Sequence, residues 1–338
     1  MKTAKILKPE GTAAGVDVET LETIINETII KLEGIKETHE LKTDSNKDQY
    51  LTNGYYFKSW DILDKHIKYL EDLKETLKDL TVNEFLNYFF LKIGNMKLNE
   101  LVYNVAPYHL CNSFLNQACL NCGICYAAKN EKYAGVMKSR LRNYLFIEYV
   151  TRTGNYFLLT AAVQKVNFKK LLSTYNSSVR QAARKAQDKE GPEEAAVILK
   201  AIINSTEEIR GLRINETGEL EDRHETYINI LISELETLLN LKFLYTYTHN
   251  RELNTIKFKR LNINESLNDM ELLNMGPAAV KEILETRNIY LNVSAAAYEN
   301  IIKYLETNNI KYVSCAGSCI KCNLCKKCIN RVIININH

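Results

Sequence analysis

The sequence predicts an α/β fold with a parallel sheet and an N-terminal helical segment. From Leu212 onward, short β-type runs alternate with stretches of helical spacing, a rhythm typical of right-handed crossovers between parallel strands. The first hundred residues carry helical patterns instead. All nine cysteines fall in two short windows, and a predicted strand leads into each window. We expect the sheet to be open or to close into a complete or partial (β/α) barrel.

Residues 1–98 are predicted to form a helical cap. Apolar residues recur there at helical spacing, and capping residues mark where helices begin. The predicted helices cover residues 17–34, begin at Ser59, and run from a Thr81/Glu84 capping box to Gly94.

Residues 99–338 are predicted to form an α/β domain that carries the cysteines. The predicted strands are 101–106, 212–215, 242–248, 289–293, 310–313 and 331–336. The predicted helices are 136–151, 156–175, 193–208, 224–239, 278–286 and 295–306, with an exposed connection at 181–192. Loops at the carboxyl ends of parallel strands gather at one edge of a sheet, so we expect the two groups of cysteines to lie at that edge, where they can meet.

The composition is that of an ordinary globular protein. The chain has 338 residues, of which 46% are hydrophobic and 25% charged, and a net charge of +3, which excludes disordered and fibrous classes. No run approaches the about 20 apolar residues that a bilayer helix needs, and the start of the chain lacks the apolar core of a secretory signal. We therefore expect a cytoplasmic protein with no membrane association.

The cysteines indicate metal chemistry, because thiols kept only for packing would be scattered. The first cysteine group contains Cys111, Cys119, Cys122 and Cys125. The second cysteine group contains Cys315, Cys319, Cys322, Cys325 and Cys328. From Cys319 the thiols recur at every third residue, as in the ferredoxin-type runs that wrap an iron–sulfur cube. All nine are candidate metal ligands, and we expect one or two iron–sulfur clusters of the 4Fe–4S type, with the second group as a cofactor-binding segment.

Two other metal chemistries fit the same cysteines. Cys-x-x-Cys pairs also form zinc knuckles, although an uninterrupted period of three favours a cluster. Cys315, Cys319 and Cys322 reproduce the Cys-x3-Cys-x2-Cys spacing with which radical S-adenosylmethionine enzymes hold three irons and leave the fourth for the cofactor. That motif normally follows the first strand of a barrel and has an aromatic residue where this chain has Lys321. A radical-SAM-like barrel with bound S-adenosylmethionine is therefore an alternative expectation.

Polar residues at the ends of predicted strands are candidate catalytic residues. Arg213, Glu216 and Glu219 lie at the end of one strand, which is a site position in parallel α/β folds; a surface ion pair is the alternative. Tyr247 and His249 end the next strand at alternate positions, so their side chains share a face.

Basic residues collect in two stretches after the first cysteine group. They are Lys129, Lys132, Lys138, Arg140 and Arg142, and then Lys169, Lys170, Arg180, Arg184, Lys185 and Lys189. Such clusters either neutralise phosphates or form solvated helix faces. Nucleic acid or a host protein is thus a candidate partner, and the sequence leaves the oligomeric state open.

Four sequence stretches resemble a family of phage and mobile-element proteins known as the "gene product eighty-eight" family. They are Cys122-Gly-Ile-Cys-Tyr-Ala-Ala, Leu212-Arg-Ile-Asn-Glu-Thr-Gly-Glu, Phe243-Leu-Tyr-Thr-Tyr-Thr-His and Cys315-Ala-Gly-Ser-Cys-Ile-Lys-Cys-Asn-Leu-Cys. The resemblance covers roughly residues 101–338. It implies an α/β, barrel-like iron–sulfur protein carried by phages or prophages, and it implies no established reaction. The cysteines of this chain are more numerous than the family leads us to expect.

The predicted function is an iron–sulfur protein with a redox, structural or binding role that engages nucleic acid or a host protein. The alternatives are a radical S-adenosylmethionine-like enzyme with an open iron site and a zinc-stabilised nucleic-acid-binding module.

Overall fold

The structure is a computed structural model of the chain. It describes residues 15–43, 55–94, 100–111, 130–131, 133–188, 195, 207–215, 218–315, 324–327 and 329–337.

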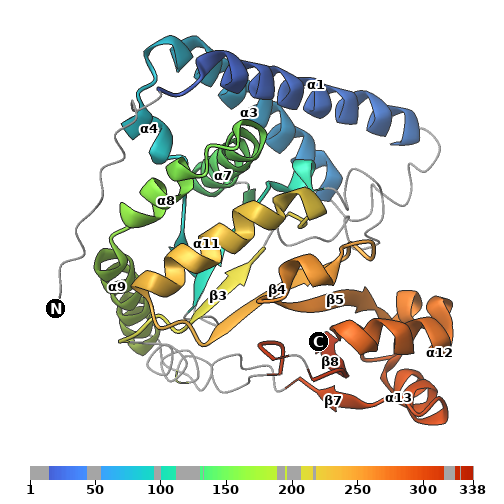
Figure 1. Cartoon of the computed structure of the whole chain (residues 1–338). Helices are drawn as coiled ribbons and strands as arrows, with labels where there is room; N and C mark the ends of the chain where they lie inside the picture. Colours follow the sequence, from blue (N-terminus) through green and yellow to red (C-terminus); the bar gives the residue numbers. More distant parts are fainter. Residues whose placement is uncertain are drawn as a thin grey trace.

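Eight strands of the described chain form one sheet in the order β1-β2-β3-β4-β5-β6-β8-β7 (Figure 1). The strands are β1 Lys92–Ile93, β2 Leu101–Tyr103, β3 Gly211–Ile214, β4 Phe243–Thr248, β5 Asn262–Asn268, β6 Asn288–Ser294, β7 Tyr312–Ser314 and β8 Val332–Asn337. β1 is antiparallel to β2, and the other pairings are parallel. The predicted α/β class with a parallel sheet is confirmed. β1 and β7 lie at the two edges of this sheet, so the described strands do not show a closed barrel.

The helices come before the sheet and between its strands. They are α1 Val18–Thr43, α3 Tyr55–Thr76, α4 Val82–Leu86, α7 Ala134–Thr153, α8 Phe157–Gln164, α9 Phe168–Gln187, α11 Glu225–Leu238, α12 Asp269–Thr286 and α13 Tyr298–Thr307. Short 3-10 turns are η1 Leu77–Asp79, η2 Tyr108–Leu110, η4 Asp222–His224 and η5 Thr255–Phe258. None of the helices in the described ranges is long and apolar enough to cross a membrane.

One face of the sheet is apolar and covered by helices. Leu212, Ile214, Ile289 and Leu291 are buried there, because alternate residues of a strand point to the same face. Helices α7, α8 and α11 pack over the part of the sheet that contains β3, and α12 and α13 pack over the part that contains β6 (Figure 1). Strands β2 to β6 follow one another in sequence order, so right-handed crossovers place their connecting helices on this one face.

The opposite face of the sheet, which we call the polar face, carries Val102, Phe243 and Ile333 and otherwise mostly polar side chains from the alternate strand positions. The polar ones are Arg213, Tyr245, Tyr247, Asn262, Asn264, Ser266, Asn288, Tyr290, Asn292 and Asn335. Polar side chains in this number on one sheet face indicate that something other than a helix layer lies against it.

The chain changes direction across the sheet after β7, because β8 lies between β6 and β7. A right-handed connection that steps back toward β6 has to run on the face opposite to the helices. Residues 324–327 belong to this connection, and they contact the polar face. The preference for right-handed connections therefore explains why Cys325 lies against the polar face.

The N-terminal helices share a hydrophobic core with the sheet. α1 packs against α3 and α7, and Leu21, Leu63, Leu145 and Leu212 belong to one buried cluster. The division into residues 1–98 and 99–338 stays a prediction.

The predicted end of the first helix is wrong. α1 continues through Gly34 to Thr43. A glycine inside a helix costs only about 1 kcal/mol relative to alanine, and the next residue, Ile35, is still buried in the core.

The capping box before α4 is confirmed, but the helix is shorter than expected. The Thr81 hydroxyl accepts a hydrogen bond from the Glu84 amide, and the Glu84 carboxylate accepts one from the Thr81 amide. The helix ends at Leu86 rather than near Gly94. Beyond it, the main chain of Phe90 bonds instead to the side chain of Asn143 in α7, with its amide donating to Oδ1 (2.7 Å) and its carbonyl accepting from Nδ2 (3.0 Å).

The predicted helix 156–175 is two helices, α8 and α9. The Asn167 side chain accepts a hydrogen bond from the Lys170 amide (2.9 Å) and begins α9. Apolar residues continue at helical spacing across the break, so the sequence does not show where α8 ends and α9 begins. α9 also extends to Gln187, so the exposed connection predicted at 181–192 is partly helical. The predicted helix 193–208 falls largely outside the described residues.

The sequence patterns missed β5 and the first half of α12. The strand reads Asn-Ile-Asn-Glu-Ser-Leu-Asn, and its polar residues are typical of a loop. Glu265 is nevertheless buried, because it pairs with Arg287 at 2.8 Å. The Asn268 side chain caps α12 (2.8 Å to the amide of Glu271). Gly276, with φ 75°, kinks this helix near its middle. The other predicted strands of the α/β domain lie within a few residues of the observed ones.

Candidate functional site

Cys325 is held against the polar face by side-chain amides. Its main-chain carbonyl accepts hydrogen bonds from Nδ2 of Asn262 (2.6 Å) and from Nδ2 of Asn264 (2.9 Å). Asn262 is the first residue of β5, so Cys325 lies toward the amino ends of the strands. The expectation that the cysteines sit at the carboxyl edge is wrong for this residue. β7 and β8 are parallel, so the connection between them must return to the amino end of the sheet.

Asn288, the first residue of β6, fixes the chain that follows Cys325. Its Nδ2 donates to the carbonyl of Lys327 (2.8 Å) and to Oδ1 of Asn264 (3.0 Å). Its Oδ1 accepts from the amides of Ile329 (2.8 Å) and Asn330 (3.0 Å). One wholly buried side chain thus makes four hydrogen bonds. We call residues 324–327 and 329–330 the docked segment.

A buried ion pair joins the docked segment to the start of β2. Nζ of Lys326 lies 2.5 Å from Oε1 of Glu100, and both side chains are almost wholly buried. The other Glu100 oxygen accepts from the hydroxyl of Tyr245 (2.7 Å). A Cβ at Gly211 would lie 2.9 Å from the Glu100 side chain, so only glycine leaves the carboxylate in this position without a shift.

Tyr247 links the docked segment to Arg213. The Arg213 guanidinium carbon lies 4.8 Å from the centre of the Tyr247 ring, and the Tyr290 ring packs edge-on against it, 5.1 Å between centroids. Burial, and then the neighbouring Cys325, raise the pKa of the Tyr247 hydroxyl well above its ordinary value. The hydroxyl therefore remains a hydrogen-bond donor beside the thiol.

Three of the nine cysteines lie in the described residues. Cys111 follows η2 and packs against the main core. Cys315 directly follows β7, and its amide donates to the carbonyl of Ile334 (2.7 Å). Cys119, Cys122, Cys125, Cys319, Cys322 and Cys328 lie outside the described residues, so the meeting of the two groups stays a prediction.

Glu219 and His249 meet at the carboxyl edge of the sheet. Glu219 accepts hydrogen bonds from the Thr248 hydroxyl (2.6 Å) and from the His249 amide (3.0 Å), and its Oε1 lies 3.3 Å from His249 Nδ1. The preceding Gly218 has φ 85°, and a Cβ there would lie 2.7 Å from the backbone nitrogen of Ala106. That close approach places the buried Glu219 carboxylate under the end of β4.

The structure therefore brings together two pairs of the five predicted catalytic residues, Arg213 with Tyr247 and Glu219 with His249. Glu216 lies outside the described residues. A histidine beside a carboxylate can transfer a proton, and an arginine over a tyrosine ring can bind an anionic group, but a reaction for these pairs stays a prediction.

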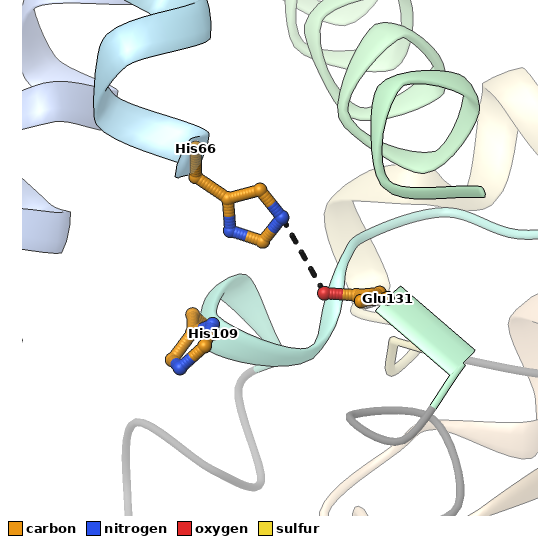
Figure 2. A group of neighbouring side chains, drawn as sticks. All are labelled: His66, His109 and Glu131. Carbon is orange, nitrogen blue, oxygen red and sulfur yellow. Dashed lines mark ion pairs between the residues drawn. The ribbon is translucent and has the colours of Figure 1, made fainter. Parts of the chain in front are cut away.

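A further group of potential metal ligands joins three separate parts of the chain. His66 of α3, His109 of η2 and Glu131, which precedes α7, are all buried, and one ligand atom from each lies within 4.8 Å of the others. Figure 2 shows the His66 ring directed at the Glu131 carboxylate, with 3.4 Å between Nε2 and Oε2. The other Glu131 oxygen accepts from NH1 of Arg140 (2.9 Å) and from the amide of Tyr108 (2.8 Å).

Burial controls the ionisation of this group. Burial, and then the nearby Arg140 cation, lower the pKa of His66 to about 3. His66 is therefore neutral at physiological pH, with a lone pair on one ring nitrogen. Burial raises the pKa of the Glu131 carboxyl, and Arg140 and the Tyr108 amide oppose that rise.

Sequence reasoning missed these residues, although one signal was present. His66 occupies a position on the apolar face of α3, between Leu63 and Leu70, which are both fully buried. A histidine at such a position needs a partner inside the protein. Its partners come from distant parts of the chain, so the sequence spacing does not show them.

Two of the basic residues predicted as phosphate ligands are committed to contacts inside the protein. Arg140 is buried against Glu131. Arg142 donates to the Tyr69 hydroxyl (2.7 Å) and lies over the ring of Tyr88. Lys138 lies over the Tyr69 ring, 5.3 Å from its centre. Arg140 and Arg142 of this first basic stretch are therefore part of the packing between helices.

α9 keeps its basic side chains on the surface. Its cations Lys169, Lys170, Arg180, Arg184 and Lys185 are exposed. The helix contains no acidic residue, and none of the five forms an ion pair with another described residue. Tyr175 and Val179 on its other side are buried with Ile93 of β1. Lys129, Lys132 and Lys189 lie outside the described residues.

Comparisons of the chain with protein-family models, with curated proteins and with solved structures give no match.

Proposed function

We propose that this chain is a phage or mobile-element iron–sulfur protein of the cytoplasm, in which the two cysteine groups hold one or two clusters with a structural or redox role. The observation that carries the proposal is the docked segment. Side-chain amides from β5 and β6 and the buried Lys326–Glu100 pair fix the main chain around Cys325 to the polar face. A rigidly held main chain is what a set of metal-binding thiols requires.

The chemistry of the donors fits a cluster. Thiolates are the protein ligands of iron–sulfur clusters and of zinc, whereas magnesium and calcium take oxygen ligands. Arg213 lies over the Tyr247 ring, and Tyr247 neighbours Cys325. This positive charge and the tyrosine hydroxyl would offset the negative charge of a cluster held by thiolates, and both are recognised ways to tune its potential.

The first experiment measures iron, acid-labile sulfide and zinc in protein purified without oxygen, together with its visible absorption spectrum. We expect brown protein with iron and sulfide in near-equal amounts, at about four or eight of each per chain for one or two cubic clusters. Colourless protein that contains zinc would replace this proposal with the zinc-stabilised module.

Two variants separate the cysteine groups. Cys111→Ser and Cys325→Ser each remove one described thiol, one from each group. If each group holds its own cluster, each variant should lose about half of the iron, whereas a single shared cluster predicts the same large loss in both. Unchanged iron in both variants would contradict the assignment of these thiols.

An enzyme that uses an open iron site and S-adenosylmethionine is the second candidate. Strands β2 to β6 lie side by side in sequence order, and helices cover one face of them. The other face is polar and carries Arg213, Tyr247 and Tyr290, which contact one another. These observations support the second candidate. The first cysteine group also follows β2, the first strand of the parallel series. Addition of S-adenosylmethionine to the reduced protein should then change the electron paramagnetic resonance spectrum of the cluster. An unchanged spectrum would favour a cluster held entirely by protein ligands.

A basic surface supports a nucleic-acid or acidic protein partner for the same chain. α9 presents five exposed cations without an acidic residue among them. Phosphate binding requires accessible cations of this kind, and the buried Arg140 does not meet that requirement.

A further inference from the structure

We infer that His66, His109 and Glu131 form a binding site for a first-row divalent metal ion, additional to any metal that the cysteine groups hold. Two imidazoles and one carboxylate make up the ligand set of catalytic zinc sites and of non-haem Fe²⁺ sites. Calcium and magnesium, which prefer oxygen ligands, are not expected there.

The geometry needs only a modest contraction to hold an ion. Zinc bonds of about 2.0–2.1 Å place two ligand atoms about 3.4 Å apart in a tetrahedral site. Nε2 of His66 and Oε2 of Glu131 are already 3.4 Å apart, and all three ligand atoms lie within 4.8 Å of one another. The His109 ring lies edge-on to His66 with 5.6 Å between centroids, so a small movement of η2 would complete the set.

The group is incomplete as a set of protein contacts. Both ring nitrogens of His66 and Oε2 of Glu131 are buried and have no hydrogen-bond partner among the described residues. Buried polar atoms in native proteins are normally bonded. A metal ion would bind one ring nitrogen of His66 and Oε2 of Glu131 through their lone pairs. Two of these three atoms would then have a bonding partner.

The neighbours of Glu131 orient its carboxylate for this purpose. Arg140 and the Tyr108 amide both bond to Oε1, which leaves Oε2 directed at His66 (Figure 2). Outer contacts of this kind fix the orientation of metal ligands. Arg140 also balances the Glu131 charge, so the bound ion would keep excess positive charge. That excess favours an anionic fourth ligand, such as hydroxide derived from a bound water.

The site would join the N-terminal helices to the α/β domain. His66 comes from α3, His109 lies between β2 and Cys111, and Glu131 lies three residues before the first residue of α7. An ion held by all three would fasten α3 to the chain that leads into the first cysteine group.

The test uses Co²⁺ as a probe, because its spectrum reports its ligands. The full chain is treated with a chelator mild enough to leave iron and sulfide unchanged and is then titrated with Co²⁺. We expect about one Co²⁺ per chain with visible d–d bands and without the near-ultraviolet band of thiolate-to-cobalt charge transfer. X-ray absorption of the same sample should show nitrogen and oxygen neighbours. Cobalt with sulfur neighbours only, or no stoichiometric binding, would overturn the inference.

Three variants assign the site. His66→Gln and Glu131→Gln should each weaken Co²⁺ binding by at least about tenfold. His224→Gln is the matched control, because His224 is another buried histidine with a lowered pKa, outside this group. Iron content and circular dichroism should match the wild type in all three. Equal Co²⁺ affinity in the wild type and both ligand variants would overturn the assignment. If a variant does not fold, the X-ray absorption of the wild type decides.

Discussion

Asn288 makes four hydrogen bonds from a fully buried position, and two of them use its amide as the donor. We predict that Asn288→Asp destabilises the protein by about 2–4 kcal/mol, because a carboxylate cannot donate to Lys327 and Asn264 and would lie buried against their oxygens. Urea unfolding followed by circular dichroism measures the loss. The variant should also bind less metal at the cysteines, since the docked segment loses its main attachment.

Asn292→Asp is the control for this variant. Asn292 lies on the same face of the same strand, half-buried, and it accepts one hydrogen bond from Asn335 (2.9 Å), which aspartate can also accept. Its effect should stay below about 1 kcal/mol. Equal losses for the two variants would show that the docked segment does not depend on Asn288.

His224 predicts a pH dependence of stability. Burial, assisted by the Arg223 cation, lowers the pKa of His224 to about 4 from its ordinary 6.5. The unfolded chain therefore binds this proton more readily than the folded chain, so the stabilisation is complete above pH 6.5 and is lost as the pH falls toward 4. The loss is at most about 1.4 kcal/mol for each pH unit in that range.

The variant His224→Gln isolates this contribution. Glutamine can still accept the hydrogen bond that His224 Nδ1 takes from the Glu221 amide (3.3 Å), but it does not titrate. Unfolding free energies at pH 7 and pH 5 should differ less in the variant than in the wild type. An identical difference in both proteins would mean that folding does not lower the pKa of His224.

At the scale of elements, α9 carries five exposed cations and no acidic residue. We predict that the triple variant Arg180→Gln, Arg184→Gln and Lys185→Gln weakens binding to single- or double-stranded nucleic acid. The slope of log K against log salt concentration should also become less steep, by about 0.7–0.9 for each phosphate that the protein no longer neutralises. Fluorescence anisotropy with a labelled oligonucleotide at several salt concentrations measures both quantities.

The control removes three exposed lysines elsewhere. Lys65→Gln, Lys68→Gln and Lys281→Gln change the net charge by the same amount, on α3 and α12. If both triple variants lose the same affinity, binding reflects net charge and not α9. If the wild type does not bind nucleic acid, the exposed cations of α9 have another role, such as keeping the protein soluble or binding an acidic protein.

Elements with a strong local pattern were predictable, and elements that depend on distant partners were not. The strands β3 and β6 carry apolar residues at alternate positions, and the Thr81 capping box lies within four residues. β5 was missed because its buried Glu265 depends on Arg287, which follows α12. In the same way, the second cysteine group was evident from its spacing, whereas the asparagines that hold Cys325 belong to strands far from it in sequence.

At the scale of the whole molecule, the Glu100–Lys326 pair connects the first parallel strand with the docked segment. Removing one partner of a buried ion pair leaves an uncompensated charge and typically costs about 3–5 kcal/mol. We predict a loss of this size for Lys326→Met. The double variant Glu100→Gln with Lys326→Met should recover part of it, because neither remaining side chain is charged.

A double-mutant cycle measured by urea unfolding tests this coupling. Its four proteins are the wild type, the two single variants and the double variant. Additive losses would show that the two side chains do not interact. A favourable coupling would show that the contact between Glu100 and the docked segment stabilises the folded protein.

The insertion of β8 between β6 and β7 also sets an order for folding. Within the described sheet β7 pairs only with β8, and the ribosome makes β7 first. β7 therefore has no strand to pair with until the cysteines of the second group and β8 have been synthesised. The sheet edge and the docked segment then form in one late step, so an ion or cluster captured by those cysteines would stabilise the last part of the protein to fold.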